Sequence, residues 1–315
     1  MTQNTNFSDI VVAIKEHAIT QHGALIESRL QELLPQARIR FLSDFPTLMD
    51  TQTVDLLITA QFPWLPDLMQ QCPALRWVHL LTSGTEVLDA CAASFPDVRM
   101  TRSAGVNATA MAEYVLGAML YHTKNLGRYA EQQREQQWQR YWSQDVGGKT
   151  MVILGTGPIG QEIARMAHAL GVRCIGVSRS GSPAAGCEQV YPMQQIDRAL
   201  PMADYLVIAL PLKPETRNCI DASMLQKLPD SCVLIDVSRG GILNTQDLIE
   251  ALRNQKLAGA TLDVFESEPL PPDSPLWTTP NLLLTPHIAG TSDHFMQNAL
   301  RIFAQYLEGA GKSSS

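Results

Sequence analysis

The sequence predicts an α/β protein that contains two doubly wound parallel sheets. Short apolar runs alternate with helical stretches over the first 100 residues. A strand, a glycine-rich turn and a helix follow one another near residue 150, and further apolar runs recur up to residue 284. Alternating strands and helices are typical of parallel sheets, and a chain of 315 residues is long enough for two cores.

The first 100 residues are expected to form a parallel α/β unit of their own. The expected strands are Ile10–Ile14, Ile39–Leu42, Val54–Thr59 and Trp77–Leu81, and the expected helices are Gly23–Leu34, Leu65–Gln71 and Glu86–Ala93. The fourth strand leads into Ser83, Gly84 and Thr85. These small residues either offer backbone N–H groups to an anion or form an ordinary strand-to-helix turn, and composition alone does not separate the two interpretations.

The next segment combines a long apolar helix with a cluster of aromatic residues. The stretch Asn107–Leu120 is rich in Ala, Met and Leu, and the Gln- and Arg-rich segment that follows carries Trp138, Tyr141 and Trp142. A helix that is apolar on most of its surface is buried in its own fold or against a partner subunit. Both interpretations remain open at this point.

A glycine-rich turn follows the buried strand Met151–Leu154. The turn and the start of the next helix read Gly155, Thr156, Gly157, Pro158, Ile159, Gly160. In this spacing the first glycine permits a tight turn, the second admits a pyrophosphate, and the third lets the helix pack on the strand. The helix amino end supplies unpaired N–H groups for phosphates, and a second strand at Val172–Val177 completes a βαβ unit. The segment therefore predicts a dinucleotide site.

Four further apolar runs are expected to extend this second sheet. They are Asp204–Pro211, Cys232–Val237, Ala258–Leu262 and Leu282–Leu284, with a helix at Asn244–Arg253 that Asn244 or Thr245 caps. Arg239, Asp263, Glu268 and His287 lie at or just past the ends of these strands. Ligands of doubly wound sheets bind at the carboxyl ends of the strands, so this arrangement indicates a site.

Three of these residues have side chains suited to acid–base chemistry on a carboxylate substrate. His287 can give and take a proton near neutral pH, and a carboxylate such as Glu268 beside it would stabilise the imidazolium. The planar fork of Arg239 suits two-point binding of a carboxylate. The alternatives are a structural histidine and a surface salt bridge. Arg239, however, lies between an apolar strand and two glycines, an unusual place for a merely solvated charge.

The bulk composition excludes several other classes of protein. A formal charge of -7 and a pI near 5.5 argue against a general nucleic-acid binder. No apolar run approaches the ~20 residues of a membrane span, and the first residues lack the features of a signal peptide. The six cysteines show no C-x-x-C spacing, so no metal site is expected. We expect a cytoplasmic protein that binds neither nucleic acid nor membrane.

In these motifs the sequence resembles the D-isomer-specific 2-hydroxyacid dehydrogenases. The resemblance runs from about Trp77 to Gly309 and rests on the glycine turn and on the segments Leu210–Leu212 with Thr216, Asp236–Gly241, Leu262–Leu270 and Thr285–Gly290. It implies a Rossmann coenzyme domain over residues 102–288 and a smaller, flavodoxin-like substrate domain made of residues 1–101 and 289–315. It also implies a homodimer formed through the coenzyme domain.

The resemblance assigns a role to each motif. Arg239 would bind the carboxylate and carbonyl oxygen of the substrate, His287 would be the acid/base, and Glu268 would hold His287 protonated. Ser83, Gly84 and Thr85 would offer N–H groups to the substrate carboxylate. Asp263 would hold the nicotinamide carboxamide or orient its neighbours. The residues expected to bind the cofactor are Gly155, Thr156, Gly157, Pro158, Ile159, Gly160, Ser178, Arg179, Ser180, Leu210, Pro211, Thr216, Val237, Ser238, Asp263 and Gly290.

One departure from the family pattern concerns the cofactor. NAD-binding relatives place an Asp at the end of the second strand, where this chain has Ser178, Arg179 and Ser180. Hydroxyls and a cation suit the 2′-phosphate of NADP(H), which an acidic side chain would repel. If Arg179 is merely solvated, the chain simply lacks NAD selectivity. We expect NADP(H) to be preferred and NAD(H) to be usable.

The expected activity is the reduction of small 2-oxo acids to D-2-hydroxy acids. The residues from Trp77 to Gly84 and those expected to bind NADP(H) look most like the glyoxylate/hydroxypyruvate reductase branch. The alternative is a nucleotide-sensing protein of the C-terminal-binding co-repressor type, which shares the fold and the Arg/Glu/His set but does not turn over a metabolite. The chain lacks the long disordered flanks that such partner-binding proteins need, which favours the enzyme.

Overall fold

The computed structural model describes residues 7–43, 50–84 and 86–309, and it divides into two compact units. Unit 1 comprises Met1–Val106 and Ser292–Ser315, and unit 2 comprises Asn107–Thr291. Each division lies a few residues further along the chain than the boundary expected from the sequence. The assignment of unit 1 to substrate and of unit 2 to coenzyme stays a prediction at this stage.

The described part of unit 1 is built on a five-stranded parallel sheet with the order β2-β1-β3-β4-β5. This is the order of flavodoxin-like sheets, as expected. The elements are β1 (Asp9–Ala13), α1 (Glu16–Leu33), β2 (Arg38–Leu42), β3 (Leu56–Thr59), α2 (Leu65–Gln70), β4 (Trp77–Leu80), α3 (Glu86–Ala92), β5 (Arg99–Arg102) and, from the carboxyl-terminal segment, α9 (Phe295–Leu307).

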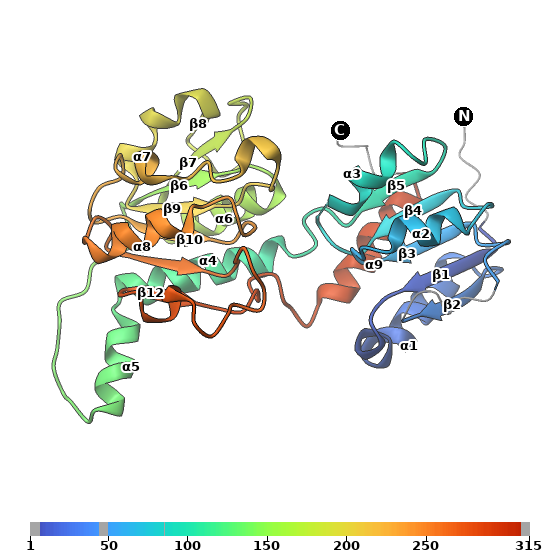
Figure 1. Cartoon of the computed structure of the whole chain (residues 1–315), viewed down its shortest axis with the longest axis horizontal. Helices are drawn as coiled ribbons and strands as arrows, with labels where there is room; N and C mark the ends of the chain where they lie inside the picture. Colours follow the sequence, from blue (N-terminus) through green and yellow to red (C-terminus); the bar gives the residue numbers. More distant parts are fainter. Residues whose placement is uncertain (1–6, 44–49, 85, 310–315) are drawn as a thin grey trace. The chain divides into compact units, whose positions relative to one another are not determined.

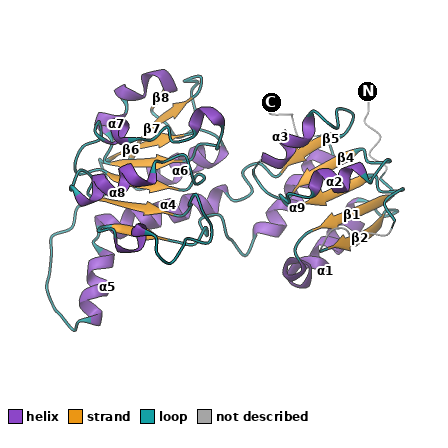
Figure 2. Cartoon of the chain, in the orientation of Figure 1, coloured by secondary structure: helices purple, strands orange, loops and turns teal. Residues whose placement is uncertain are grey.

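Alternate residues of β1, an interior strand of the sheet, contribute to the two cores of unit 1. In β1, Ile10 and Val12 pack in a cluster with residues of α1 and α9, whereas Val11 and Ala13 pack on the other face with residues of α2 and α3. Successive side chains of a strand point to opposite faces, so a strand buried on both faces is apolar throughout. Figure 2 shows the helices that cover the strands of this sheet.

Unit 2 contains a seven-stranded parallel sheet in its described residues, with the order β12-β11-β10-β9-β6-β7-β8. Numbered within the unit, this is the order 3-2-1-4-5-6 of Rossmann domains with one further strand. The strands are β6 (Thr150–Leu154), β7 (Arg173–Ser178), β8 (Gln189–Pro192), β9 (Tyr205–Ile208), β10 (Val233–Asp236), β11 (Gly259–Leu262) and β12 (Leu282–Leu284). The predicted fold class is confirmed for both units.

Helices cover both faces of this second sheet (Figures 1 and 2). The α-helices are α4 (Ala108–Thr123), α5 (Leu126–Arg134), α6 (Pro158–Ala169), α7 (Ala222–Leu225) and α8 (Thr245–Arg253), with short 3-10 helices at Met193–Arg198, Leu200–Met202, Pro214–Thr216 and Pro275–Thr278. Asn244 caps α8, because its side chain accepts hydrogen bonds from the next turn. On one face α4 packs on α6, and its residues Met111, Val115 and Met119 are buried there. The apolar helix is therefore buried within its own unit.

Two strands at sheet edges, β5 and β8, were not expected from the sequence. The expected strands and helices are otherwise present, with ends shifted by a few residues. The largest shift is at α1, which begins at Glu16 rather than Gly23. None of the helices within residues 7–43, 50–84 and 86–309 has the length and apolar character needed to cross a membrane.

Candidate active site

The glycine turn after β6 has the geometry that the spacing predicted. Gly155 has a φ of +101°, and a Cβ there would lie 2.5 Å from the carbonyl oxygen of Ala209. A Cβ on Gly160 would overlap the carbonyl oxygen of Gly155, so helix and strand approach as closely as glycine allows. A Cβ on Gly157 would meet no atom within 4 Å, which leaves open space at the amino end of α6. These features fit the pyrophosphate of a dinucleotide.

The end of β7 carries hydroxyls and a cation rather than a carboxylate. The Ser178 hydroxyl accepts a hydrogen bond from the Gly181 N–H at 3.0 Å, and the hydroxyls of Ser180 and Ser182 lie 2.8 Å apart. Arg179 is exposed and forms no ion pair with the residues that the structure describes. The guanidinium is therefore available to an anion at this end of the strand.

The loop after β9 is closed by one buried hydroxyl. The Thr216 hydroxyl donates to the Pro211 carbonyl at 2.7 Å and accepts from the Lys213 N–H at 2.8 Å. Leu210, one residue earlier, is half-buried against the sheet core. Thr216 thereby shapes the loop that begins with Leu210 and Pro211.

A buried carboxyl group supports the segment that carries Arg239. Asp236, at the end of β10, accepts hydrogen bonds from the N–H of Ser238 at 2.9 Å and from its hydroxyl at 2.5 Å. The pKa of Asp236 is raised to about 7, mainly by burial and to a smaller extent by the nearby charge of Asp263, although the hydrogen bonds from Ser238 lower it. Val237 and Ser238 are buried, whereas Arg239 is half-buried and its Nη1 donates to the Ser238 carbonyl at 2.8 Å.

The structure brings Glu268 and His287 into direct contact. Oε2 of Glu268 is 2.8 Å from Nδ1 of His287, and its other oxygen accepts from the Phe265 N–H at 3.0 Å. The two side chains are 37% and 46% exposed, so solvent and small molecules can reach them. His287 also has a φ of +55°, an uncommon conformation for a residue other than glycine. A paired imidazole that is open to solvent is the arrangement expected of an acid/base.

Asp263, at the end of β11, holds the segment on which His287 lies. Its carboxylate is 1% exposed and accepts three hydrogen bonds: from the Thr285 hydroxyl at 2.6 Å and from the N–H groups of Ile288 and Ala289, each at 2.8 Å. This geometry corresponds to the second of the two roles expected for Asp263, the orientation of its neighbours. A Cβ on Gly290 would strike the side chain of Asn107 at the start of α4.

All of these groups follow parallel strands of one sheet. Arg239 follows β10, Asp263 follows β11, and Thr285 follows β12, which are neighbours in the strand order. The amino-acid sequence predicted Arg239, Glu268 and His287 as site residues. It assigned no role to Asp236 or Thr285, although both are polar residues at the ends of apolar strands. Among the residues described, no three His, Cys, Asp or Glu side chains are grouped as a metal site requires.

The predicted contribution of unit 1 lies in the turn after β4. In this turn the Ser83 hydroxyl donates to the Ser103 carbonyl at 3.2 Å, and Arg102 donates to the Ser83 carbonyl. Ser83 and Gly84 are half-buried, and Thr85 lies outside the described residues. The role of this turn in holding a substrate carboxylate stays a prediction.

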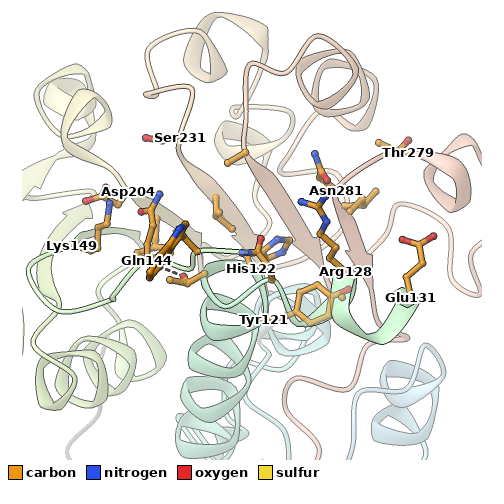
Figure 3. Close-up of a pocket in the computed structure, with 18 of the residues that line it drawn as sticks. Tyr121, His122, Arg128, Glu131, Gln144, Lys149, Asp204, Ser231, Thr279 and Asn281 are labelled. Carbon is orange, nitrogen blue, oxygen red and sulfur yellow. Dashed lines mark hydrogen bonds and ion pairs between the residues drawn. The ribbon is translucent and has the colours of Figure 1, made fainter. Parts of the chain in front are cut away.

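A second feature of unit 2 lies at the opposite, amino-terminal edge of its sheet. A cavity of about 1060 Å³ is lined there by residues at or just before the starts of several strands, including Lys149, Asp204, Ser231 and Asn281, and by residues of α4 and α5. Figure 3 shows that charged and polar side chains dominate this lining, with Lys149 beside Asp204. It is remote from the glycine turn, which lies at the carboxyl end of β6.

Comparison with known proteins defines the class to which this fold and site belong. Residues 116–289 match the family described as "D-isomer specific 2-hydroxyacid dehydrogenase, NAD binding domain". The chain belongs to this family of NAD(P)-dependent oxidoreductases, which act on the CH–OH group of 2-hydroxy acids and, in reverse, on 2-oxo acids. The family resemblance seen in the sequence is confirmed.

Individual relatives support the same assignment. The chain is 34% identical over 238 residues to a glyoxylate reductase of Aeropyrum pernix, covering 72% of this chain and 70% of that protein. A D-isomer specific 2-hydroxyacid dehydrogenase of Xanthobacter autotrophicus, solved with NADPH and MES, matches with a TM-score of 0.83, 30% identity and coverage of 97% and 96%. An NADPH-dependent glyoxylate/hydroxypyruvate reductase of Sinorhizobium meliloti, solved with NADP and sulfate, matches with a TM-score of 0.81, 30% identity and coverage of 96% of each chain.

Proposed function

We propose that this protein reduces small 2-oxo acids, such as glyoxylate or hydroxypyruvate, to D-2-hydroxy acids with NADPH. The observation that carries the proposal is the Glu268–His287 pair, which lies in the same unit as the glycine turn and Arg239. Similar proteins named glyoxylate reductase and glyoxylate/hydroxypyruvate reductase support the substrate class. The D configuration of the product rests on the family alone.

In the proposed mechanism the bound nicotinamide supplies the hydride, and residues of the chain supply charge and the proton. Nδ1 of His287 is engaged by Glu268, so Nε2 is the nitrogen that donates a proton to the substrate oxygen. Glu268 stabilises the imidazolium before this transfer. Arg239 binds the substrate carboxylate and the carbonyl oxygen through its two-pronged guanidinium. In the reverse direction His287 accepts the proton from the hydroxyl group.

The test of this function is a kinetic screen. Oxidation of NADPH and of NADH would be followed side by side with glyoxylate, hydroxypyruvate and larger 2-oxo acids. Turnover with at least one of these acids at physiological concentration supports the proposal. Absence of turnover with the whole panel, despite tight NADPH binding, would instead favour the nucleotide-sensing alternative.

The preference for NADP(H) is proposed from the end of β7. The exposed Arg179 and the hydroxyls of Ser178 and Ser180 present hydrogen-bond donors and positive charge where a carboxylate would repel a phosphate. The solved relatives from Xanthobacter and Sinorhizobium contain NADPH and NADP, respectively, which supports the same preference.

Replacement of Arg179 by alanine is expected to raise KM for NADPH by roughly 10-fold or more, because one charge-assisted contact to the phosphate is lost. KM for NADH should change by less than about twofold, since NADH lacks that phosphate. Steady-state kinetics with both cofactors gives the answer. Arg173→Ala, at the other end of β7, is the matched control. Equal effects of Arg179→Ala on the two cofactors would contradict the assignment.

We also propose that unit 2 forms a homodimer through α5 and the segment that follows it. Of the residues of α5, only Gln132 is buried, and Trp138 and Trp142 in the following segment are 95% and 99% exposed. Exposed tryptophans of this kind are typical of interfaces, and Trp142 also lines the cavity at the amino-terminal edge of the sheet. A symmetric dimer would place the segment of each copy against the other.

This assembly can be tested by sedimentation. The wild-type protein should sediment as a dimer, and the double variant Trp138→Ala/Trp142→Ala should shift toward the monomer at the same micromolar concentration. Leu25→Ala, which removes an exposed apolar side chain of unit 1, should leave the dimer intact. A wild-type monomer, or a double variant that remains fully dimeric, would refute the proposed interface.

A further inference from the structure

The His287 segment is fixed at its backbone by a series of hydrogen bonds. The N–H of His287 donates to the Thr285 carbonyl at 3.0 Å, and the next two N–H groups donate to Asp263 at 2.8 Å. These bonds hold His287 at a positive φ that its side chain disfavours. The position of the imidazole beside Glu268 therefore depends on what holds Asp263 and Thr285.

A tyrosine from a distant part of the chain completes this series. The Tyr114 hydroxyl, on α4, lies 2.5 Å from the Thr285 hydroxyl. Because Thr285 uses its single hydroxyl proton to donate to Asp263, Tyr114 must be the donor in its own contact with Thr285. Burial raises the pKa of Tyr114 to about 12, so the phenol keeps this proton throughout the working pH range.

Tyr114 lies near the middle of α4, the helix with which the chain enters unit 2. Unit 1 gives way to unit 2 after Val106, and α4 begins just beyond this boundary. The segment 285–291 ends at the second boundary between the units, after Thr291. The Asn107 side chain packs against Gly290, so the amino end of α4 and this segment touch at a second point. Tyr114 and Asn107 thus attach the His287 segment to a helix whose apolar side is buried in the core of unit 2.

We propose that Tyr114 and Thr285 are positioning residues that act through Asp263 to set the geometry of His287. The Tyr114–Thr285–Asp263 series keeps the N–H groups of Ile288 and Ala289 in place, and these fix the turn that directs the imidazole toward Glu268. The inference rests on the proposed role of His287 as the acid/base. Neither Tyr114 nor Thr285 contacts substrate or cofactor in this scheme.

The test compares Tyr114→Phe, Thr285→Val and Thr285→Ser. The first two remove one hydroxyl each and should lower kcat by roughly three- to tenfold, because a slightly misplaced acid transfers its proton less efficiently. KM for NADPH should stay within about twofold of the wild-type value. Thr285→Ser keeps the hydroxyl and should restore kcat. The NMR signal of the His287 imidazole should shift in Tyr114→Phe and Thr285→Val and return toward its wild-type position in Thr285→Ser.

Tyr205→Phe is the matched control. The Tyr205 hydroxyl pairs with the Thr123 hydroxyl at 2.7 Å, so this variant also removes a partly buried Tyr–Thr hydrogen bond to α4, but at the last residue of the helix rather than near its middle. It should change neither kcat nor the His287 signal. Equal losses of kcat in Tyr205→Phe and Tyr114→Phe would show general loosening of the fold and overturn the proposal.

The imidazole signal separates this proposal from the proposed function. If the wild-type protein reduces no 2-oxo acid, yet the His287 signal responds to Thr285→Val and recovers in Thr285→Ser, the reaction is wrong and the positioning is right. If His287 is required for turnover but Tyr114→Phe and Thr285→Val match the wild type in kcat and in the imidazole signal, the positioning role is wrong and the reaction stands.

Discussion

His287→Ala is expected to lower kcat for 2-oxo acid reduction by roughly 10²–10⁴-fold, the usual contribution of a positioned general acid. The proton donor of the proposed mechanism is lost, and an alanine side chain has no group that could give or take a proton. NADPH binding should survive, since His287 takes no part in the glycine turn. Single-turnover and steady-state kinetics, together with NADPH fluorescence titration, measure both quantities.

The matched control for this variant is His168→Ala. His168 lies in the last turn of α6 and is far along the helix from the glycine turn. Its loss should leave kcat within about twofold of the wild-type value, as for other surface positions. A kcat that is unchanged in His287→Ala would remove this histidine from the mechanism.

Arg239→Ala is expected to lower kcat/KM for 2-oxo acids on the order of 10²–10³-fold, because the carboxylate of the substrate loses its cationic partner. Arg239→Lys should recover only part of this loss, since an ammonium group cannot form the paired hydrogen bonds of a guanidinium. Cofactor binding should be little affected in either variant. The comparison requires kcat/KM for one 2-oxo acid at saturating NADPH.

Arg253→Ala, in the last turn of α8, controls for the loss of one positive charge from unit 2. It should leave kcat/KM close to the wild-type value, because attraction between distant exposed charges is screened by salt. Full activity of Arg239→Ala would show that another group binds the substrate carboxylate, and the proposed orientation of the substrate would have to be abandoned.

Most of the fold could be predicted because the central strands of both sheets are buried on both faces. Runs such as Met151–Leu154 are apolar throughout and can be recognised without knowing their partners. The missed strands are edge strands with partly polar sequences. Arg99–Arg102 contains two arginines, and Gln189–Pro192 ends in a proline, which is tolerated only where one side of the strand is unpaired. Gly23, an apparent helix start, lies inside α1.

The candidate site was predictable only where a side chain is rare in its setting. His287, Glu268 and Arg239 stand out because their ionisable side chains lie within a few residues of the ends of apolar strands. Tyr114 and Thr285 do not, because tyrosine and threonine are common in helices and at strand ends. Their hydrogen bond joins residues 171 positions apart, and only the packing of α4 against the sheet brings them together. Tertiary proximity of this kind leaves no local trace in the sequence.

The strand order of unit 1 also bears on how the protein behaves at high concentration. Within the described residues the edge strands of its sheet are β2 and β5, and each carries two arginines, whereas β1, β3 and β4 carry none. Unpaired strand edges invite pairing with strands of other molecules, and positive charges along an edge oppose it. The arginines that make β5 hard to recognise as a strand are therefore expected to disfavour pairing of that edge with another molecule.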